Sequence, residues 1–293
     1  NFKGGVAKTF SSSTLAQYLA LRGWRVLLVD LDPQASLSTT FGLDSTKTDD
    51  WSTVLPYLYG RKMIEDEGNE FPTSFRSVIQ KTYWPGIDLV ASNLNLYSGD
   101  FVLALQREND RAFPFYRPVH DGLEDVRGEY DIIIIDTPPS LSLTTTGALY
   151  AADGIVVPTQ AELIDYESAR AFIKLATEVL QGIGSGFGES KGFELFRVLI
   201  TRYKQSQSHA AANILSVFGE WCVPEPMVDS AAVSRQMGDL TTIFEADPRS
   251  KGRGVLKRAV EAANDVYGLL ERDLIRVFQE RSARQSAVKA YGT

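Results

Sequence analysis

Residues 1–9 read Asn1-Phe2-Lys3-Gly4-Gly5-Val6-Ala7-Lys8-Thr9. Two adjacent glycines let the backbone approach an anion closely, and the apolar spacing over 9–21 predicts a helix whose first N–H groups would hold that anion. In a phosphate-binding loop of this kind, Lys8 would reach the β and γ phosphates of a nucleotide, and the Thr9 hydroxyl would bind Mg²⁺. A glycine turn with two solvated lysines fits the same nine residues, so the loop needs support from the rest of the chain.

Two apolar runs that end in carboxylates supply this support. The run over 25–32 ends in Asp30 and Asp32, and the run over 131–136 has four isoleucines before Asp136. Such runs are typical of parallel strands buried on both faces, and α/β sheets bind ligands at the carboxyl ends of their strands. Asp32 would position a water for attack on the γ-phosphate, and Asp136 would hold Mg²⁺ through water. Acids that cap the next helix are the alternative.

These motifs resemble those of the ParA/MinD family of ATPases, which carry a deviant Walker A loop. The matching stretches, in family order, are Lys3-Gly4-Gly5-x-x-Lys8-Thr9, Asp30-Leu31-Asp32-Pro33-Gln34 and Asp136-Thr137-Pro138-Pro139. The resemblance implies an α/β fold of the deviant P-loop NTPase type, with a mostly parallel twisted sheet and helices on both faces. It implies a single ATPase domain over 1–293.

The resemblance also implies a set of site residues. The implied nucleotide-binding residues are Lys3, Gly4, Gly5, Val6, Ala7, Lys8, Thr9, Phe10, Arg202 and Pro226. The implied catalytic residues are Lys3, Lys8 and Asp32, and Lys3 would reach the nucleotide of a partner subunit. The implied Mg²⁺-binding residues are Thr9, Asp32 and Asp136. Arg202 would stack on adenine, with an ordinary surface arginine as the equal alternative.

Two positions depart from the family pattern. Ala7 stands where glycine is usual, and Phe10 stands where a Thr or Ser hydroxyl usually lies near the α-phosphate. An alanine with positive φ would cost about 1 kcal/mol, whereas one with helical φ is tolerated. Both departures bear on hydrolysis more than on nucleotide binding.

The start of the sequence and one later stretch bear on domain organisation. A phosphate-binding loop follows a buried strand, so we expect that strand outside residues 1–293. Ser230-Ala231-Ala232-Val233-Ser234 resembles the larger plasmid-partition ParA proteins, including the RepA proteins of replication–partition cassettes. Because those proteins carry an N-terminal helix-turn-helix region, we expect that region outside these residues as well.

Composition excludes several classes of protein. With 44% hydrophobic and 23% charged residues, the chain is typical of a globular protein. It has no apolar run long enough to span a bilayer and no signal peptide, which favours a cytoplasmic protein. The family resemblance implies in addition that the protein is associated with the nucleoid and has no membrane partner. The single cysteine, Cys222, excludes a disulfide framework, a thiolate metal cage and the bridging cluster of a nitrogenase-iron-protein-like reductase.

Charge is unevenly distributed along the chain. The net charge is −7, but residues 249–293 hold ten Lys or Arg against five acids, a local charge of +5. This basic C-terminal helical segment, 250–293, includes a long amphipathic pattern over 254–281. Candidate contacts to DNA phosphates are Lys251, Arg253, Lys257 and Arg258. A solvated helix face is a nearly equal alternative for these four.

Further patterns predict the remaining elements. We expect strands over 87–91, 154–158 and 196–203, helices over 163–180 and 208–218, a loop over 182–192, and an edge strand over 221–224. The poorly periodic region over 44–84 is interpreted as a helical insertion whose aromatic residues pack against the core.

The resemblance implies a DNA-segregation ATPase. ATP and Mg²⁺ would join two subunits face to face, the homodimer would bind DNA without sequence preference, and a centromere-binding partition protein would stimulate hydrolysis and release the DNA. One alternative is a MinD-like membrane-cycling ATPase, although the tail after Arg281 has little apolar area to bury. A second is an ATP-gated DNA-binding scaffold with little hydrolysis. Small-molecule ligation or kinase chemistry is a third, for which the sequence offers no second substrate site.

Overall fold

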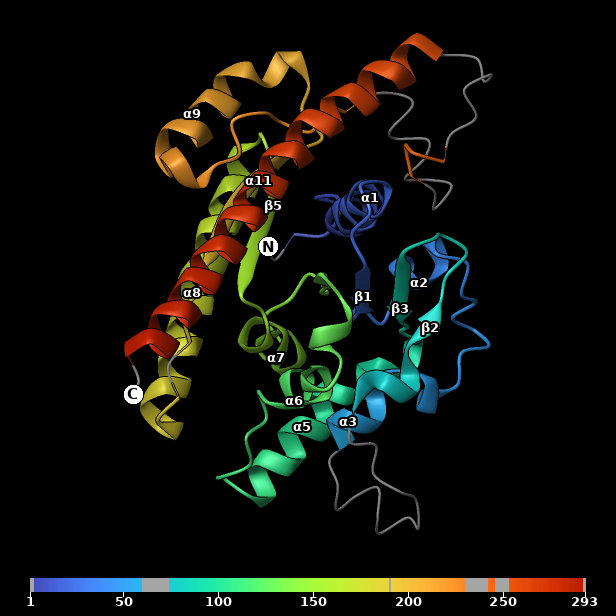
Figure 1. The fold of residues 1–293 in the computed structure, drawn as a ribbon, viewed down its shortest axis with the longest axis vertical. Helices are drawn as coiled ribbons and strands as arrows, with labels where there is room; N and C mark the ends of the chain where they lie inside the picture. The colour runs from blue at the N-terminus through green and yellow to red at the C-terminus, as the bar shows by residue number, and fades with distance from the viewer. Residues whose placement is uncertain (1–2, 60–73, 190, 230–241, 246–252, 292–293) are drawn as a thin grey trace.

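The computed structural model describes residues 3–59, 74–189, 191–229, 242–245 and 253–291. Its strands are β1 Val26–Asp30, β2 Gln80–Lys81, β3 Ile87–Val90, β4 Ile132–Asp136, β5 Gly154–Gln160 and β6 Leu195–Thr201. Its α-helices are α1 Lys8–Leu21, α2 Ser36–Thr40, α3 Leu55–Tyr59, α5 Tyr97–Asn109, α6 Pro118–Glu124, α7 Leu143–Ala151, α8 Leu163–Phe187, α9 Ser208–Phe218 and α11 Arg253–Tyr291 (Figure 1). The predicted α/β class is confirmed.

The strands form two sheets. The first has the order β2-β3-β1-β4, in which β1 is parallel to both β3 and β4 and only the short β2 is antiparallel. The second consists of β5 and β6, paired in parallel along their whole length. The strands are therefore mostly parallel, as predicted, but β4 and β5 are not paired with each other.

Helices cover both faces of the first sheet, as expected. Leu27 and Val29 of β1 pack into a core with residues of α3, α5, α6, α7 and α8. Val26 and Leu28 pack into a second core with residues of α1, α2 and α11. Successive side chains of a strand point to opposite faces, so the continuous apolar run of β1 fills both cores.

The long helix α11 is fixed to α1 and to the second sheet by polar contacts. Buried Glu271 accepts hydrogen bonds from Tyr18 (3.2 Å) and Trp24 (3.0 Å) and pairs with Arg22, all in or just after α1. Further along, Asp273 accepts two bonds of 2.7 Å from Arg197 of β6. The helix therefore links α1 to the second sheet, and in the view of Figure 1 it crosses in front of β5. It is longer than the predicted 254–281.

Several predicted elements differ in detail. The loop expected over 182–192 is wrong in its first half, because α8 continues to Phe187 and ends at Gly188, whose φ of 74° suits a helix stop. The edge strand expected over 221–224 is wrong. A 3₁₀ turn covers Gly219–Trp221, and a single bridge joins Cys222 to Val198.

The expected helical insertion is partly confirmed. The short helix α3 and the 3₁₀ turns Asp50–Ser52 and Phe75–Val78 lie in this region, together with β2. Tyr57 and Phe75 are buried in the core, with ring centroids 4.5 Å apart. By contrast, Trp51 and Tyr83 are exposed, so only part of the aromatic set packs as predicted. Residues 60–73 and the Ser230–Ser234 stretch lie outside the described residues.

No helix within the described ranges is both long and apolar enough to cross a bilayer. Along α11, Leu270 and Val277 are buried in the protein, whereas Ile275 and Phe278 are exposed.

Candidate nucleotide-binding site

The loop before α1 has the backbone of an anion cradle. Gly5 has a φ of 77°, and Ala7 has φ 61° and ψ 35° immediately before α1 begins at Lys8. The alanine therefore stands in the left-handed region, at a cost of about 1 kcal/mol. A Cβ placed on Gly4 or Gly5 would meet nothing within 4 Å, so the space in front of the glycines is open.

Side chains from the second sheet hold this loop from behind. Gln160 and Arg202 donate to the Gly5 carbonyl at 3.1 and 3.2 Å, and Thr201 donates to the Val6 carbonyl at 2.9 Å. In a trans peptide the next N–H points away from the carbonyl. The bonds to β5 and β6 therefore direct the N–H groups of Val6 and Ala7 to the opposite side, where an anion would lie.

A hydroxyl and a carboxylate meet where α1 approaches β4. Thr9 donates to Asp136 at 2.7 Å, and Ser12, one helical turn later, donates to the other carboxylate oxygen at 3.0 Å. Burial raises the pKa of Asp136 to about 6, although the two hydroxyls oppose that shift. Thr9 and Asp136 offer the hard oxygen ligands that suit Mg²⁺, which takes few carboxylates. The described residues contain no cluster of three or more His, Cys, Asp or Glu that would favour another metal.

A cavity of about 240 Å³ joins the loop to the end of β1. Its lining includes the predicted residues Gly4, Gly5, Ala7, Lys8, Thr9, Phe10 and Asp32, together with Ser13, Ser36, Thr40 and Pro139. The Asp32 carboxylate is oriented by the backbone N–H of Gln34 at 2.9 Å. Pro139 belongs to the Asp136-Thr137-Pro138-Pro139 motif. All three sequence motifs therefore border one space.

Lys8 is half-buried and points back over the loop. Its ammonium donates to the Lys3 carbonyl at 3.2 Å. Burial lowers the pKa of Lys8, and the nearby Asp136 and Asp32 carboxylates oppose this shift. A desolvated ammonium inside an anion cradle is suited to bind phosphate.

Lys3 makes a contact within its own chain. Its ammonium lies 2.6 Å from Asp165 Oδ1 and 3.9 Å from Glu162 Oε2, at the start of α8. The Asp165 side chain is fully buried, and its hydrogen bond raises the pKa of Lys3. In the described conformation Lys3 is thus directed to α8 and not outward to a second subunit.

Two of the predicted nucleotide-binding residues, Arg202 and Pro226, do not line the cavity. Arg202 has a φ of 51° and uses its guanidinium to contact the loop carbonyl of Gly5. Pro226 precedes Met227, whose N–H donates to the Ile200 carbonyl and whose carbonyl accepts from the Tyr203 N–H. Pro226 is therefore beside Arg202; the stacking of Arg202 on adenine and the binding of nucleotide by Pro226 stay predictions.

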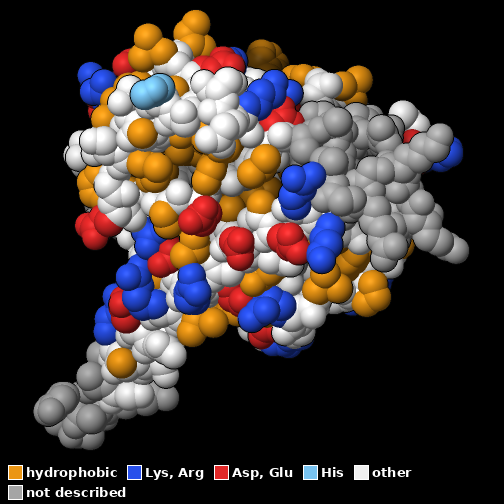
Figure 2. Space-filling model, turned by 90° about the horizontal axis from the view of Figure 1, so that it is seen from above, with side chains coloured by type: hydrophobic (Ala, Val, Ile, Leu, Met, Phe, Trp, Pro, Cys, Tyr) orange, Lys and Arg blue, Asp and Glu red, His pale blue; other side chains and the backbone are white. Residues whose placement is uncertain are grey.

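The DNA-binding candidates are distant from this cavity in sequence and do not line it. Lys251 lies outside the described residues, and α11 begins at Arg253. Lys257 and Arg258 are exposed, and Lys257 pairs with Glu261 at 3.7 Å. Figure 2 shows Lys and Arg side chains interspersed with Asp and Glu on the face that it presents.

Four contacts of the site were not anticipated from the sequence, those of Ser12, Gln160, Thr201 and Asp165. Ser12 carries a recognisable signal, because it lies three residues after Thr9 on the same helix face. Gln160 and Thr201 end parallel strands, where ligand sites gather. Nothing local distinguishes Asp165 from the other acids of the chain.

Comparison with known proteins agrees with this geometry. Residues 1–185 match the family model described as "AAA domain". The replication protein A of Rhizobium rhizogenes is 36% identical over 92% of this chain and 66% of its own length. The chromosome-partitioning ATPase Soj of Treponema pallidum is 32% identical over 75% of this chain and 77% of its own length.

A solved structure with nucleotide is also similar. Cobyrinic acid a,c-diamide synthase from Mycobacterium smegmatis, solved with bound ADP and magnesium, is 27% identical with a TM-score of 0.61. The match covers 78% of this chain and 84% of that one. The fold is thus that of the ParA/MinD-type P-loop NTPases. The chain spans 66% and 64% of the lengths of the first two curated relatives that it matches.

Proposed function

This chain belongs to the ParA-type partition ATPases, and we propose that it is an ATP- and Mg²⁺-dependent DNA-segregation ATPase. The observation that carries the proposal is the convergence of the loop residues, Asp32 and the Asp136 motif on one cavity. The Soj relative is described as a chromosome-partitioning ATPase, and its match extends over most of both chains. We propose that residues 1–293 form one ATPase domain with a basic C-terminal segment over 250–293.

The chain's own residues would divide the work of phosphoryl transfer. The loop N–H groups and Lys8 bind and orient the phosphates, and Thr9 and Asp136 hold the metal. Mg²⁺ supplies charge neutralisation at the β- and γ-phosphates when it is bound. The Asp32 carboxylate, fixed by the Gln34 N–H, holds the attacking water. Little covalent chemistry is required of the protein, so positioning and electrostatics account for the rate.

The finer steps of the proposal are dimerisation, DNA binding and release. ATP would join two copies across their nucleotide sites, with each Lys3 reaching the partner's phosphates. The dimer would bind DNA through phosphate contacts that include Lys257 and Arg258, and a centromere-binding partition protein would stimulate hydrolysis. We place this cycle in the cytoplasm, on the nucleoid.

Sedimentation velocity of the protein with ADP, ATP or a non-hydrolysable analogue, with and without duplex DNA of unrelated sequence, tests the proposal. We expect a dimer only with triphosphate, and DNA association only by that dimer. Association should weaken as salt rises, because phosphate contacts release counterions. An oligomeric state that is the same with every nucleotide, together with no binding to DNA, would overturn the proposed partition cycle.

The Lys3–Asp165 contact within one chain should compete with formation of this dimer, and substitutions can test that competition. If Lys3 leaves Asp165 to reach a partner, Lys3→Ala should abolish the triphosphate-dependent dimer while nucleotide binding by the monomer persists. Asp165→Asn should release Lys3 in both subunits and lower the dissociation constant of the dimer by about a hundredfold, if each of the two contacts is worth about 1.4 kcal/mol.

Glu162→Gln is the matched control, because Glu162 lies 3.9 Å from Lys3 and is half-exposed. It should dimerise like the wild type. An intact ATP dimer of Lys3→Ala would contradict the crossing role of Lys3.

An ATP-gated scaffold is the second candidate, and one observation favours it. Phe10, which replaces a hydroxyl residue of the family pattern, is buried in the core beside Ala7. Because phenylalanine has no hydroxyl group, Phe10 cannot supply the hydroxyl contact to the α-phosphate that the family pattern provides. Dimerisation and DNA binding without turnover would support the scaffold.

A further inference from the structure

The turn that follows β1 carries Asp32 to the nucleotide cavity. Its shape is set by three hydrogen bonds of Asp32. The Asp32 N–H donates to the Asp30 carboxylate at 3.1 Å, and the Asp32 carboxylate accepts from the Gln34 N–H at 2.9 Å. The Asp32 carbonyl accepts from the Ala35 N–H at 2.8 Å. All three partners lie within residues 30–35, so these bonds shape the turn locally.

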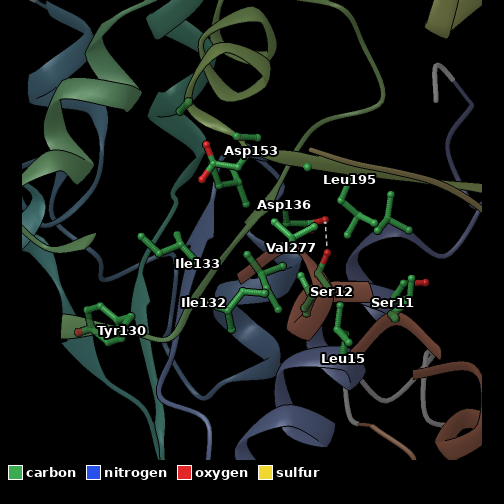
Figure 3. Close-up of a pocket in the computed structure, with 18 of the residues that line it drawn as sticks. Ser11, Ser12, Leu15, Tyr130, Ile132, Ile133, Asp136, Asp153, Leu195 and Val277 are labelled. Carbon is green, nitrogen blue, oxygen red and sulfur yellow. Dashed lines mark hydrogen bonds between the residues drawn. The ribbon is translucent and has the colours of Figure 1, made fainter. Parts of the chain in front are cut away.

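The start of this turn is fixed at the edge of the first sheet. The Leu31 N–H donates to the Asp136 carbonyl of β4 at 2.9 Å. Asp136 is held by α1 in its turn, because its carboxylate accepts from the Ser12 hydroxyl at 3.0 Å, as the dashed line in Figure 3 shows. The residue before Asp32 therefore has a place that β4 and α1 set together.

The end of the turn is held by helix α5. The side-chain amide of Gln34 donates to the hydroxyl of Tyr97 at 2.6 Å, and Tyr97 is the first residue of α5. Gln34 thus contacts Asp32 through its backbone N–H and Tyr97 through its side chain. One residue therefore connects the Tyr97 hydroxyl to the Asp32 carboxylate.

Helix α5 is itself tied to the helix that follows the Asp136 motif. Asp100 lies three residues after Tyr97, on the same face of α5. Its carboxylate accepts from the Thr144 N–H at 2.7 Å and from the Thr144 hydroxyl at 2.8 Å. Thr144 is in the first turn of α7, where backbone N–H groups lack helical partners and a carboxylate is stabilising. The start of α5, and with it Tyr97, therefore has a fixed position.

We propose that Tyr97 is a positioning residue for ATP hydrolysis, whose hydroxyl acts through Gln34 to hold Asp32 in place. This inference rests on the proposed function, in which the Asp32 carboxylate holds the attacking water. Tyr97 does not line the cavity, so it acts through the hydrogen bond to Gln34 and not through contact with nucleotide. A displacement of about 1 Å in a positioning group can cost about 100-fold in rate. Loss of this anchor should therefore slow hydrolysis without weakening ATP binding.

Tyr97→Phe removes the hydroxyl and keeps the ring. Tyr97 is 60% exposed, so the substitution opens no buried cavity, and thermal unfolding should match that of the wild type. Phosphate release over a range of ATP concentrations gives kcat and KM. We expect kcat to fall about three- to tenfold, as for one neutral hydrogen bond, and KM to stay within about twofold of the wild type. Isothermal titration should show an unchanged number of ATP sites per chain, which excludes a loss of active protein.

A double variant tests whether the effect passes through Gln34. Gln34→Ala removes the side-chain amide but keeps the backbone N–H that Asp32 accepts from. It should lower kcat by a factor similar to that of Tyr97→Phe. Adding Tyr97→Phe to Gln34→Ala should then change kcat by less than about twofold, because both substitutions remove the same hydrogen bond.

Tyr59→Phe is the matched control. It removes a hydroxyl that lies 3.3 Å from the Ser98 Oγ, next to Tyr97 on the same helix. Within the described part of the chain, the Tyr59 hydroxyl has no hydrogen bond to the turn after β1. The kcat of Tyr59→Phe should therefore equal that of the wild type.

Hydrogen exchange without nucleotide examines the same anchor independently of turnover. The amides of Gln34 and Ala35 both donate to Asp32. In Tyr97→Phe they should exchange about three- to tenfold faster, because the turn opens more easily. Amides of β1 are the internal control and should exchange as in the wild type, since that strand is buried. If exchange changes in this way but the wild type has no turnover, the anchor stands and the proposed function fails.

Three results would overturn the proposal. An unchanged kcat in Tyr97→Phe, in a protein whose wild type hydrolyses ATP, would show that the hydroxyl does not position Asp32. Exchange at Gln34 and Ala35 that equals the wild type would show that the hydroxyl does not hold the turn. Effects of Tyr97→Phe and Gln34→Ala that multiply in the double variant would show that Tyr97 does not act through Gln34.

Discussion

Lys8→Ala is expected to weaken ATP binding by at least about 100-fold. Removing one partner of a desolvated charge pair costs about 2–5 kcal/mol, and each 1.4 kcal/mol is a factor of ten in affinity. Lys8 is half-buried, and no carboxylate of the described residues forms an ion pair with it within 4 Å. Its ammonium is therefore available to phosphate, apart from the bond to the Lys3 carbonyl.

Isothermal titration with ATP and Mg²⁺ measures this loss. Lys257→Ala is the matched control, because Lys257 is exposed on α11 and pairs with Glu261. That variant should bind nucleotide normally and should lose DNA affinity instead. A thermal melt of Lys8→Ala should stay within about 1 kcal/mol of wild type, since one modest hydrogen bond is lost. Micromolar ATP affinity in Lys8→Ala would refute the phosphate-loop assignment.

The loop, the strands and their terminal acids could be predicted because each carries a local pattern. The adjacent glycines, the apolar run of β1 and the four isoleucines of β4 can each be recognised from residues that are neighbours in the sequence. The pairing of the strands then sets how their terminal acids are aligned. Asp30 of β1 is paired directly with Asp136 of β4, so two acids more than 100 residues apart reach the same edge.

Other features depend on distant contacts and left no local pattern. Asp165 differs from Glu167 and Glu178 of α8 in being fully buried and in facing Lys3 across the loop, and both properties arise from distant contacts. Arg202, which contacts the Gly5 carbonyl, has a left-handed φ of 51°, which an arginine rarely adopts. The length of α8 was underestimated because its glycines between 182 and 186 disfavour a helix, while Ile183 is buried in the core.

The separation of the sheets between β4 and β5 also lies beyond local reasoning. Each strand carries a local apolar pattern, but which strands pair depends on contacts between distant residues. Among the described residues, β4 pairs with β1 and β5 pairs with β6.

Asp32→Asn is expected to keep the nucleotide-dependent dimer and to lose at least about 100-fold in turnover, the usual range for a positioned acid or base. The amide retains an acceptor for the Gln34 N–H, so the turn that follows β1 should survive. What disappears is the charge on the cavity wall across from the loop. A neutral amide holds and polarises the attacking water less effectively, while the phosphate contacts of Lys8 and Thr9 are untouched.

Phosphate release measured with saturating ATP and DNA gives the turnover, and sedimentation of the same sample shows the dimer. Asp44→Asn is the matched control, because Asp44 is outside the cavity and pairs with Lys47 on the surface. If turnover persists in Asp32→Asn, Asp32 does not take part in the reaction. If the wild-type protein dimerises and binds DNA but shows no more turnover than Asp32→Asn, the ATP-gated scaffold is indicated. The double variant Ala7→Gly, Phe10→Thr would then show whether the residues usual in the family restore hydrolysis.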